Sequence, residues 1–187
     1  VAGAGVQWIR DKIKLINNAY ETEKIAKSKK NNSGVYLVPA FTGLGAPYWS
    51  PNSRGLLSGL TRNTDWKDIV RAVIESVAYQ SFDLFKAMNR DGLKPRVVKV
   101  DGGMVSNNWF SQFLSDILGI KVIRPKINET TALGAAFIAG LYIGEYNSFK
   151  SISKIWKVDK RFNPKINKSS RIKLLKGWEQ AIKRALI

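Results

Sequence analysis

Residues 97–103 read VVKVDGG, a run that predicts a β-strand over Val97–Val100 and a sharp turn immediately after it. Two consecutive glycines allow the backbone to turn tightly and to come close to a ligand. A helix is predicted next, over about Asn107–Leu118, and the first turn of a helix offers unpaired N–H groups and a positive dipole end to a phosphate. Asn107 adds an amide that donates and accepts hydrogen bonds, as a base or ribose requires.

The same turn has a purely structural interpretation. Gly102 and Gly103 then do no more than reverse the chain, and Asp101 caps the turn rather than serving a metal-bound nucleotide. Taken alone, the motif favours this structural interpretation.

Further strands and helices are predicted on both sides of the turn. Apolar residues at helical spacing, short apolar runs and cap residues mark them. The predicted helices cover residues 5–20, 66–89, 107–118, 130–142 and 170–185, and the predicted strands cover 35–41, 55–60, 97–100 and 120–123. Helices that alternate with strands are typical of an α/β domain, in which ligands bind beyond the carboxyl ends of the strands.

The longest predicted helix begins after Thr64, which we expect to be its cap. Asp65 and Asp68 fall in its first turn, where the helix dipole favours negative charge. Its apolar residues lie close to heptad spacing and predict one face packed on a core. These residues are Trp66, Val70, Val73, Val77, Leu84 and Met88.

The helix predicted from Thr130 or Thr131 is rich in small residues, with ALGAA at 132–136. Small side chains let a helix pack closely against a neighbour, and this is the interpretation we favour. The alternative is that they leave room for a flat adenine ring.

The composition excludes several kinds of site. The 187 residues include no cysteine and no histidine, so disulfides, thiol nucleophiles, Ser-His pairs and imidazole-ligated zinc are ruled out. Any chemistry must rest on carboxylates, hydroxyls, amides, backbone groups, cations or a bound ion. No apolar run is long enough to cross a bilayer, so we expect a soluble, cytoplasmic domain with no membrane partner.

The net charge of +17 raises the question of an acidic partner. Nucleic-acid binding needs a basic face, but the lysines are scattered along the chain, so a nucleic-acid partner is not favoured. The densest region begins at Lys150, and we expect a basic helical tail over about 150–187. A solvated surface is the favoured interpretation of this tail, and a docking surface for an acidic partner or a missing domain is the alternative.

Several long motifs, in order, resemble those of one kinase family. VPAFTGLGAPYW at 38–49 looks like the hallmark loop of the glycerol kinases within the FGGY carbohydrate-kinase family. GLLSGL at 55–60 and DIVRAVIE at 68–75 are similar to that family's second signature, and VDGG at 100–103 and ETTALGAA at 129–136 complete the match. The resemblance covers essentially the whole chain.

The resemblance implies an α/β fold of the actin-like ATPase, ribonuclease H-like type, with a mixed sheet flanked by helices. It implies that residues 1–187 are a single C-terminal, nucleotide-binding domain that lacks its N-terminal partner domain. The implied nucleotide contacts are Gly3, Gln7, Gly103 and Asn107, with ATP or ADP as ligand and Mg²⁺ bound through the nucleotide.

The reaction implied by the resemblance transfers the terminal phosphoryl of MgATP to glycerol, giving sn-glycerol 3-phosphate. It requires in-line positioning, charge neutralisation and a carboxylate that accepts the hydroxyl proton. In the family that base is an aspartate upstream of the segment where this chain begins. We therefore assign no catalytic and no metal-ligating residue here, and expect the chain alone to be inactive.

Two alternatives stay open beside this interpretation. In the first, the chain is the equivalent domain of another polyol or sugar kinase; in the second, it is a non-catalytic basic module derived from a kinase. Such a module would stack bases on aromatic residues such as Trp156, between Lys154 and Lys157. We favour a core position for Trp156 and Trp178. A homo-oligomer is compatible with either reading.

Overall fold

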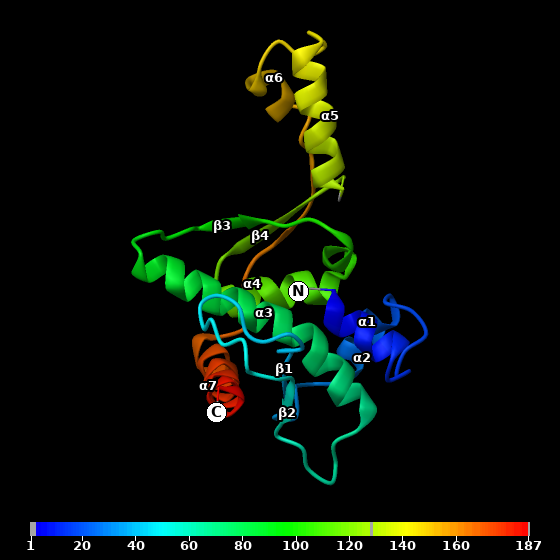
Figure 1. The fold of residues 1–187 in the computed structure, drawn as a ribbon, viewed down its shortest axis with the longest axis vertical. Coiled ribbons are helices and arrows are strands. Elements are labelled where there is room, and N and C mark those ends of the chain that lie inside the picture. Colours follow the sequence, from blue (N-terminus) through cyan, green and yellow to red (C-terminus); the bar gives the residue numbers. More distant parts are fainter. Residues whose placement is uncertain (1–2, 128, 187) are drawn as a thin grey trace.

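The computed structural model describes residues 3–127 and 129–186, which form seven α-helices, one 3₁₀ helix and five strands. In Figure 1 most helices gather in a body at the bottom, and an arm that carries α5 and α6 projects from it. The elements are α1 (Ala4–Asp11), α2 (Glu21–Ser28), β1 (Tyr36–Val38), β2 (Leu56–Ser58), α3 (Trp66–Arg90), β3 (Val97–Lys99), η1 (Gly103–Ser106), α4 (Asn108–Leu118), β4 (Lys121–Pro125), α5 (Thr130–Tyr142), α6 (Phe149–Ser153), β5 (Val158–Phe162) and α7 (Lys168–Ala185).

The single helix predicted over 5–20 is wrong, because α1 ends at Asp11 and a second helix, α2, begins at Glu21. The apolar spacing that suggested one helix reflects core contacts made by two different segments. Ile9 in α1 and Ile16 in the following turn are both buried, while Ile13 between them is 45% exposed.

The strands β1 and β2 form a small antiparallel sheet, with Leu37 opposite Leu57. All three residues of β1 are buried. The loop between the strands includes Gly43, whose φ of 96° and close approach to the backbone of Pro51 leave no room for a side chain. Only glycine fits there, since a Cβ would lie 2.8 Å from the Pro51 Cα.

The cap of α3 is Asp65 and not Thr64. The Asp65 carboxylate accepts hydrogen bonds from the N–H groups of Lys67 (2.8 Å) and Asp68 (3.1 Å), and the Asp68 carboxylate accepts one from the Asp65 N–H (3.0 Å). This reciprocal arrangement is a capping box. The Thr64 hydroxyl accepts from the Thr61 N–H instead, one turn earlier.

The predicted apolar face of α3 is only partly buried. Val70 and Val73 in its first half are fully buried, whereas Trp66, Leu84 and Met88 are each more than 40% exposed. Since α3 is 25 residues long, its two ends extend past the elements that cover its middle.

The second sheet has the order β3-β4-β5, with β3 parallel and β5 antiparallel to β4, so it is mixed. Helix α4 lies between β3 and β4 in the chain and packs on the sheet face that carries Val122 and Phe162. The opposite face is largely uncovered: Val97 is 43% exposed, and Lys99 and Lys121 are exposed too.

The strand β5 lies within the predicted helical tail, so that prediction is wrong for residues 158–162. Its sequence, VDKRF, is mostly polar because the middle residues are exposed, and only Phe162 at its end is buried. The mixed sheet flanked by helices, and the α/β class, are confirmed.

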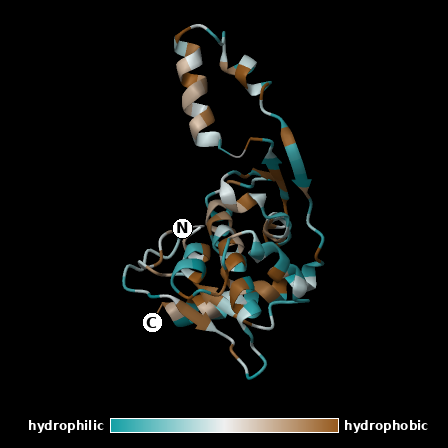
Figure 2. Cartoon of the chain, turned by 90° about the vertical axis from the view of Figure 1, so that its right-hand side faces the viewer, coloured by the Kyte–Doolittle hydropathy of each residue, from teal (hydrophilic) through white to brown (hydrophobic). Residues whose placement is uncertain are grey.

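The small-residue helix α5 lies in the arm, away from the body (Figures 1 and 2). Gly140 is its one buried residue, and no atom lies within 4 Å of the position that a Gly134 Cβ would take. The close packing that we favoured from the sequence is therefore wrong for this structure. Ile138 is 66% exposed and Tyr142 is 91% exposed, so α5 presents apolar surface without a partner in the described chain.

Two apolar clusters form the core of the body. The larger one surrounds Trp178 of α7, whose ring stacks on Tyr79 at 5.3 Å, and the smaller one surrounds Ile9 and Val73. The core position expected for Trp178 is confirmed, since it is 2% exposed. Trp156 is only half-buried, and the Lys99 ammonium lies 4.2 Å from its ring. Among the described residues, no helix is both long and apolar enough to span a membrane.

Candidate functional site

The glycine turn follows β3 directly. Pairing of the two parallel strands continues to Val100, whose N–H donates to the Ile123 carbonyl at 3.1 Å. Gly102 then adopts φ 85° and ψ 173°, a conformation that residues with a Cβ rarely adopt, and η1 begins at Gly103. At both glycines the space beside the Cα is open, with no atom within 4 Å of a Cβ position. A ligand can therefore approach the backbone of this turn closely.

Asp101 does not cap this turn. The start of η1 has no side-chain cap, and Asp101 is exposed. Within the described residues, no group of three acidic side chains converges into a metal site.

Asn107 is the N-cap of α4. Its side-chain oxygen accepts from the Phe110 N–H at 2.8 Å, and its amide nitrogen donates to the Thr22 hydroxyl at 3.2 Å. The next residue, Asn108, donates its backbone N–H to Glu23 at 3.1 Å. These bonds fix the start of α4 against α2, and so fix the position of the turn.

Gly3 and Gln7 lie on the first turn of α1. Gly3 is the N-cap, and its carbonyl accepts from the Gln7 N–H at 3.0 Å. Both residues are exposed. The helix is held on α3 by close packing at Gly5, where a Cβ would meet Val73 at 3.0 Å. The four residues predicted from the sequence thus lie at two helix starts, one on α1 and one at the η1–α4 junction, and all are accessible.

Arg124 of β4 binds the backbone of η1 and the start of α4, and the sequence analysis missed this residue. Its guanidinium donates to the carbonyls of Val105 (2.7 Å) and Ser106 (3.2 Å) and to the Asn108 side chain (3.2 Å). It also forms an ion pair with Asp159 of β5 at 2.6 Å. Arg124 is only 8% exposed, so it holds η1, α4 and β5 in one arrangement. The available signal was an arginine directly after the apolar residues Val122 and Ile123 in the strand KVIRP.

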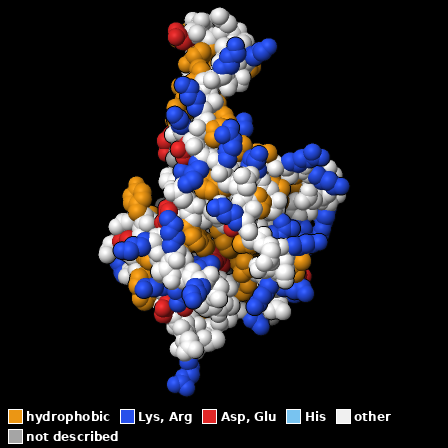
Figure 3. All heavy atoms as spheres, turned by 180° about the vertical axis from the view of Figure 1, so that it is seen from behind, with side chains coloured by type: hydrophobic (Ala, Val, Ile, Leu, Met, Phe, Trp, Pro, Cys, Tyr) orange, Lys and Arg blue, Asp and Glu red, His pale blue; other side chains and the backbone are white. Residues whose placement is uncertain are grey.

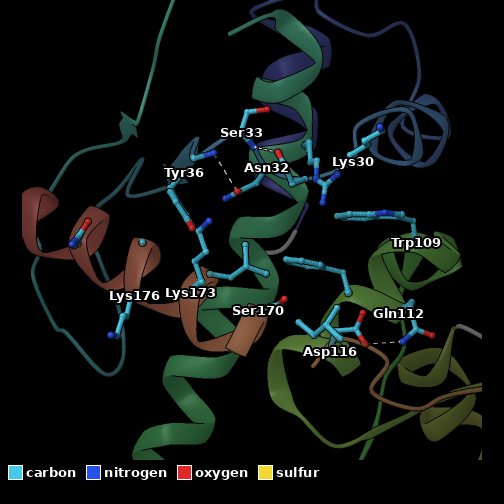
Figure 4. Close-up of a pocket in the computed structure, with 18 residues that line it drawn as sticks. Lys30, Asn32, Ser33, Tyr36, Trp109, Gln112, Asp116, Ser170, Lys173 and Lys176 are labelled. Atoms are coloured by element: carbon cyan, nitrogen blue, oxygen red, sulfur yellow. Dashed lines mark hydrogen bonds between the residues drawn. The ribbon is translucent and has the colours of Figure 1, made fainter. Parts of the chain in front are cut away.

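A separate cavity of about 930 Å³ lies between the turn at 30–34, α4 and α7 (Figure 4). None of the four predicted residues lines it. We place the candidate functional site at the glycine turn rather than in this cavity, because the turn combines an open backbone, a helix start and two of the four sequence-predicted positions, Gly103 and Asn107.

The basic residues do not gather in one patch on the face shown in Figure 3. Lys and Arg side chains are spread over it from the arm to the bottom of the body. A nucleic-acid interface would need them to line one groove or stripe. This distribution favours the interpretation of the +17 charge as solvated surface.

Comparisons with known proteins point to one family. Residues 1–142 match the family model described as the FGGY family of carbohydrate kinases, C-terminal domain. Glycerol kinase from Alteromonas mediterranea is 53% identical over 184 residues, which are 98% of this chain and 37% of that protein. Glycerol kinase 2 from Thermotoga maritima is 49% identical and covers 100% of this chain and 38% of that protein.

Solved structures agree on the fold. The crystal structure of Plasmodium falciparum glycerol kinase with ADP matches with a TM-score of 0.88 and 39% identity, over 100% of this chain and 37% of that one. A xylulose kinase from Lactobacillus acidophilus matches with a TM-score of 0.77 at 24% identity, over 97% of this chain and 37% of that one, which supports the fold alone. The chain thus spans little more than a third of the length of these relatives.

Proposed function

The chain belongs to the FGGY family of carbohydrate kinases, as its C-terminal domain, and we propose that it is the nucleotide-binding part of a glycerol kinase. The complete enzyme would transfer the terminal phosphoryl of MgATP to glycerol and give sn-glycerol 3-phosphate. The observation that carries this proposal is the open glycine turn at the end of β3, in a chain that is about half identical to glycerol kinases.

In this proposal the nucleotide is bound by Gly103 and Asn107 at the turn and by Gly3 and Gln7 at the start of α1. The Gly103 backbone can approach phosphate or ribose without hindrance, because nothing fills the space beside it. The helix starts add N–H groups and a positive dipole end to this surface. Mg²⁺ would be held by the phosphates of the nucleotide.

The catalytic base and the glycerol pocket would come from the N-terminal part of the kinase. A phosphoryl transfer needs its nucleophile activated and held in line with the phosphate, and binding of the nucleotide alone supplies neither. We therefore expect this chain to bind nucleotide and to leave glycerol unchanged.

The uncovered face of the mixed sheet and the apolar side of α5 are the surfaces that we propose the N-terminal part covers. Val97 on the sheet and Ile138 and Tyr142 on α5 are exposed, although such residues are usually buried. Burial of about 100 Å² of apolar surface contributes on the order of 2–3 kcal/mol, so covering these residues would stabilise an assembly. We place the assembled enzyme in the cytoplasm.

Calorimetric titration of the purified chain with ADP and Mg²⁺ tests nucleotide binding. The site variant is Gly103→Trp, because nothing lies within 4 Å of the Cβ position at Gly103 and the bulky indole would block the turn; thermal unfolding checks that this variant is folded. Binding by the parent and loss in the variant are expected. Equal binding by the parent and the variant would indicate that the nucleotide binds away from the turn.

Glycerol kinase activity is tested by adding the N-terminal part of a close relative to the purified chain. ATP-dependent formation of sn-glycerol 3-phosphate is expected from the mixture and from neither part alone. A folded, associated mixture that phosphorylates a different polyol or sugar instead would overturn glycerol as the substrate but keep the kinase. Salt-sensitive binding to generic DNA, without nucleotide binding, would favour the non-catalytic basic module.

A further inference from the structure

The cavity between the turn at 30–34, α4 and α7 is lined by both apolar and polar residues, three lysines among them, and the proposed kinase function leaves it unused. Its volume is about 930 Å³, which is in the range of pockets that hold small organic molecules. The apolar and aromatic residues that line it are Tyr36, Trp109, Phe113, Ile166 and Leu174. Tyr36 and Phe113 are both less than 10% exposed, so these walls belong to the core.

Three of the residues that line this cavity are lysines. Lys30, Lys173 and Lys176 line it, and no ion pair involves them in the part of the chain that the structure describes. In Figure 4 Lys173 points toward Asn32 and Tyr36, into the cavity, while Lys176 points away from it.

Of the other charged residues in the lining, Asp116 offsets only one of these three positive charges. The Asp116 carboxylate already accepts hydrogen bonds from the Lys165 N–H at 2.6 Å and from the Gln112 amide at 3.0 Å. Arg71 is paired with the fully buried Glu75 at 2.6 Å, so its charge is balanced within the protein. The lining therefore carries a surplus of positive charge.

The start of α7 adds to this positive potential. Ser170, in its first turn, lines the cavity, and that turn carries Lys168 and no acidic residue. Helices usually place acids in the first turn because the dipole is positive there. An anion bound in the cavity would supply the negative charge that the sequence of α7 omits.

The aromatic wall is held rigidly before any ligand binds. Trp109 stacks on Phe113 with ring centres 5.0 Å apart and planes 11° apart, and the Arg71 guanidinium lies 4.9 Å from the Trp109 ring. A wall fixed in this way loses little conformational entropy when a ligand is bound, which favours affinity.

We propose that this cavity binds a small amphipathic organic anion, with its apolar body against Tyr36, Phe113 and Leu174 and its anionic head near Lys173. The site is separate from the glycine turn, since Gly3, Gln7, Gly103 and Asn107 lie outside its lining. The proposal for this cavity does not depend on whether the chain binds nucleotide.

The test uses 8-anilinonaphthalene-1-sulfonate, a flat apolar molecule with one anionic head, titrated into the chain and followed by its fluorescence. N-phenyl-1-naphthylamine, which has the same rings without the sulfonate, reports the contribution of the head. Lys173→Glu is the site variant, and Lys150→Glu is the matched control, because Lys150 is exposed on α6 in the arm.

We expect the affinity of one class of sites for the sulfonate to fall by about tenfold or more in Lys173→Glu, since a charge-assisted contact is replaced by repulsion. Binding by Lys150→Glu and binding of the neutral probe by every variant should stay unchanged. Equal weakening by the two substitutions would indicate a non-specific charge effect, and no change in Lys173→Glu would place the probe elsewhere; either result overturns the proposal. Thermal unfolding of each variant checks that the fold is intact.

Discussion

The Asn107 amide nitrogen donates a hydrogen bond to the hydroxyl of Thr22, 85 residues earlier in the chain, at 3.2 Å. At the same time the Asn107 oxygen accepts from the Phe110 N–H at 2.8 Å and caps α4. One side chain therefore joins α2 to the start of α4 at the turn that we propose binds nucleotide. The two atoms of the amide contribute separately, because the oxygen caps α4 and the nitrogen connects α4 to α2.

Asn107→Ala is expected to destabilise the chain by about 1 kcal/mol, the usual loss for removing an N-cap. Asn107→Asp keeps a cap acceptor and loses only the donor to Thr22, so its loss should be smaller. Urea unfolding followed by circular dichroism measures both values. Equal losses in the two variants would mean that the link to Thr22, and not the cap, determines stability here.

Asp68 makes stability depend on pH in the acid range. Burial alone would raise the pKa of Asp68, but hydrogen bonds from the Asp65 N–H, Lys29 and Ser33 outweigh it and lower the pKa from its usual 3.8. The folded-state pKa lies below the unfolded one, so this stabilisation is present above pH 3.8 and is lost as the pH falls through the folded value.

The free energy of unfolding is therefore expected to fall more steeply with acid in the parent than in Asp68→Asn, which cannot titrate. Urea titrations between about pH 2 and 6 measure the two slopes. Parallel curves would show that Asp68 has the same pKa in the folded and unfolded states.

Local sequence signals predicted the glycine turn and the helices α3, α4, α5 and α7 well. The VDGG turn and the end of α4 before Gly119 depend on a few adjacent residues, so pattern and propensity are sufficient there. Gly119 has a φ of 71° at the end of α4, where glycine is preferred. The family resemblance carried the rest of the fold class.

Features that depend on distant contacts were missed. The break between α1 and α2 follows from burial of Ile16 in the core, and β5 forms because its backbone pairs with β4, although its sequence is polar. The role of Arg124 depends on carbonyls 18 and 19 residues earlier in the chain. The first two contacts leave no local signal, and the arginine in KVIRP does not indicate which carbonyls it contacts, so a single sequence did not reveal them.

Arg124 is expected to position the turn rather than to touch the nucleotide. Arg124→Lys keeps a positive charge but lacks the planar fork, so it cannot bond Val105, Ser106 and Asp159 together. We expect a loss of about 1–3 kcal/mol in unfolding free energy, and weaker binding of ADP, measured by calorimetry on folded protein. Unchanged ADP binding with reduced stability would limit Arg124 to a purely structural role.

Asp83 has the opposite pH dependence to Asp68. Burial raises the pKa of Asp83, although hydrogen bonds from Trp178 and Tyr48 oppose the change. The folded-state pKa lies above the unfolded one, so the protonated form is favoured in the fold, and its stabilisation is lost as the pH rises through the folded value. The Trp178 indole N–H donates to the Asp83 carboxyl at 2.7 Å.

Asp83→Asn keeps an acceptor for Trp178 and carries no charge. The variant should therefore gain stability relative to the parent as the pH rises from about 4 to 7, a difference that urea unfolding at several pH values measures. A variant that is less stable by a constant amount at every pH would mean that the ionised carboxylate is not penalised by burial.

Ile138 and Tyr142 distinguish a surface for the N-terminal part from ordinary exposed residues. Both are largely exposed on α5, so the double substitution Ile138→Asp, Tyr142→Ser should change the stability of the isolated chain by no more than about 0.5 kcal/mol.

If the N-terminal part covers α5, the same variant should associate with it at least tenfold more weakly, because a buried carboxylate without a partner is strongly unfavourable. Analytical ultracentrifugation of the mixture gives the affinity, and Leu186→Asp, at a 40% exposed position just after α7 in the body, is the control. Full association of the double variant would leave α5 outside the interface and direct attention to the open face of the sheet at Val97.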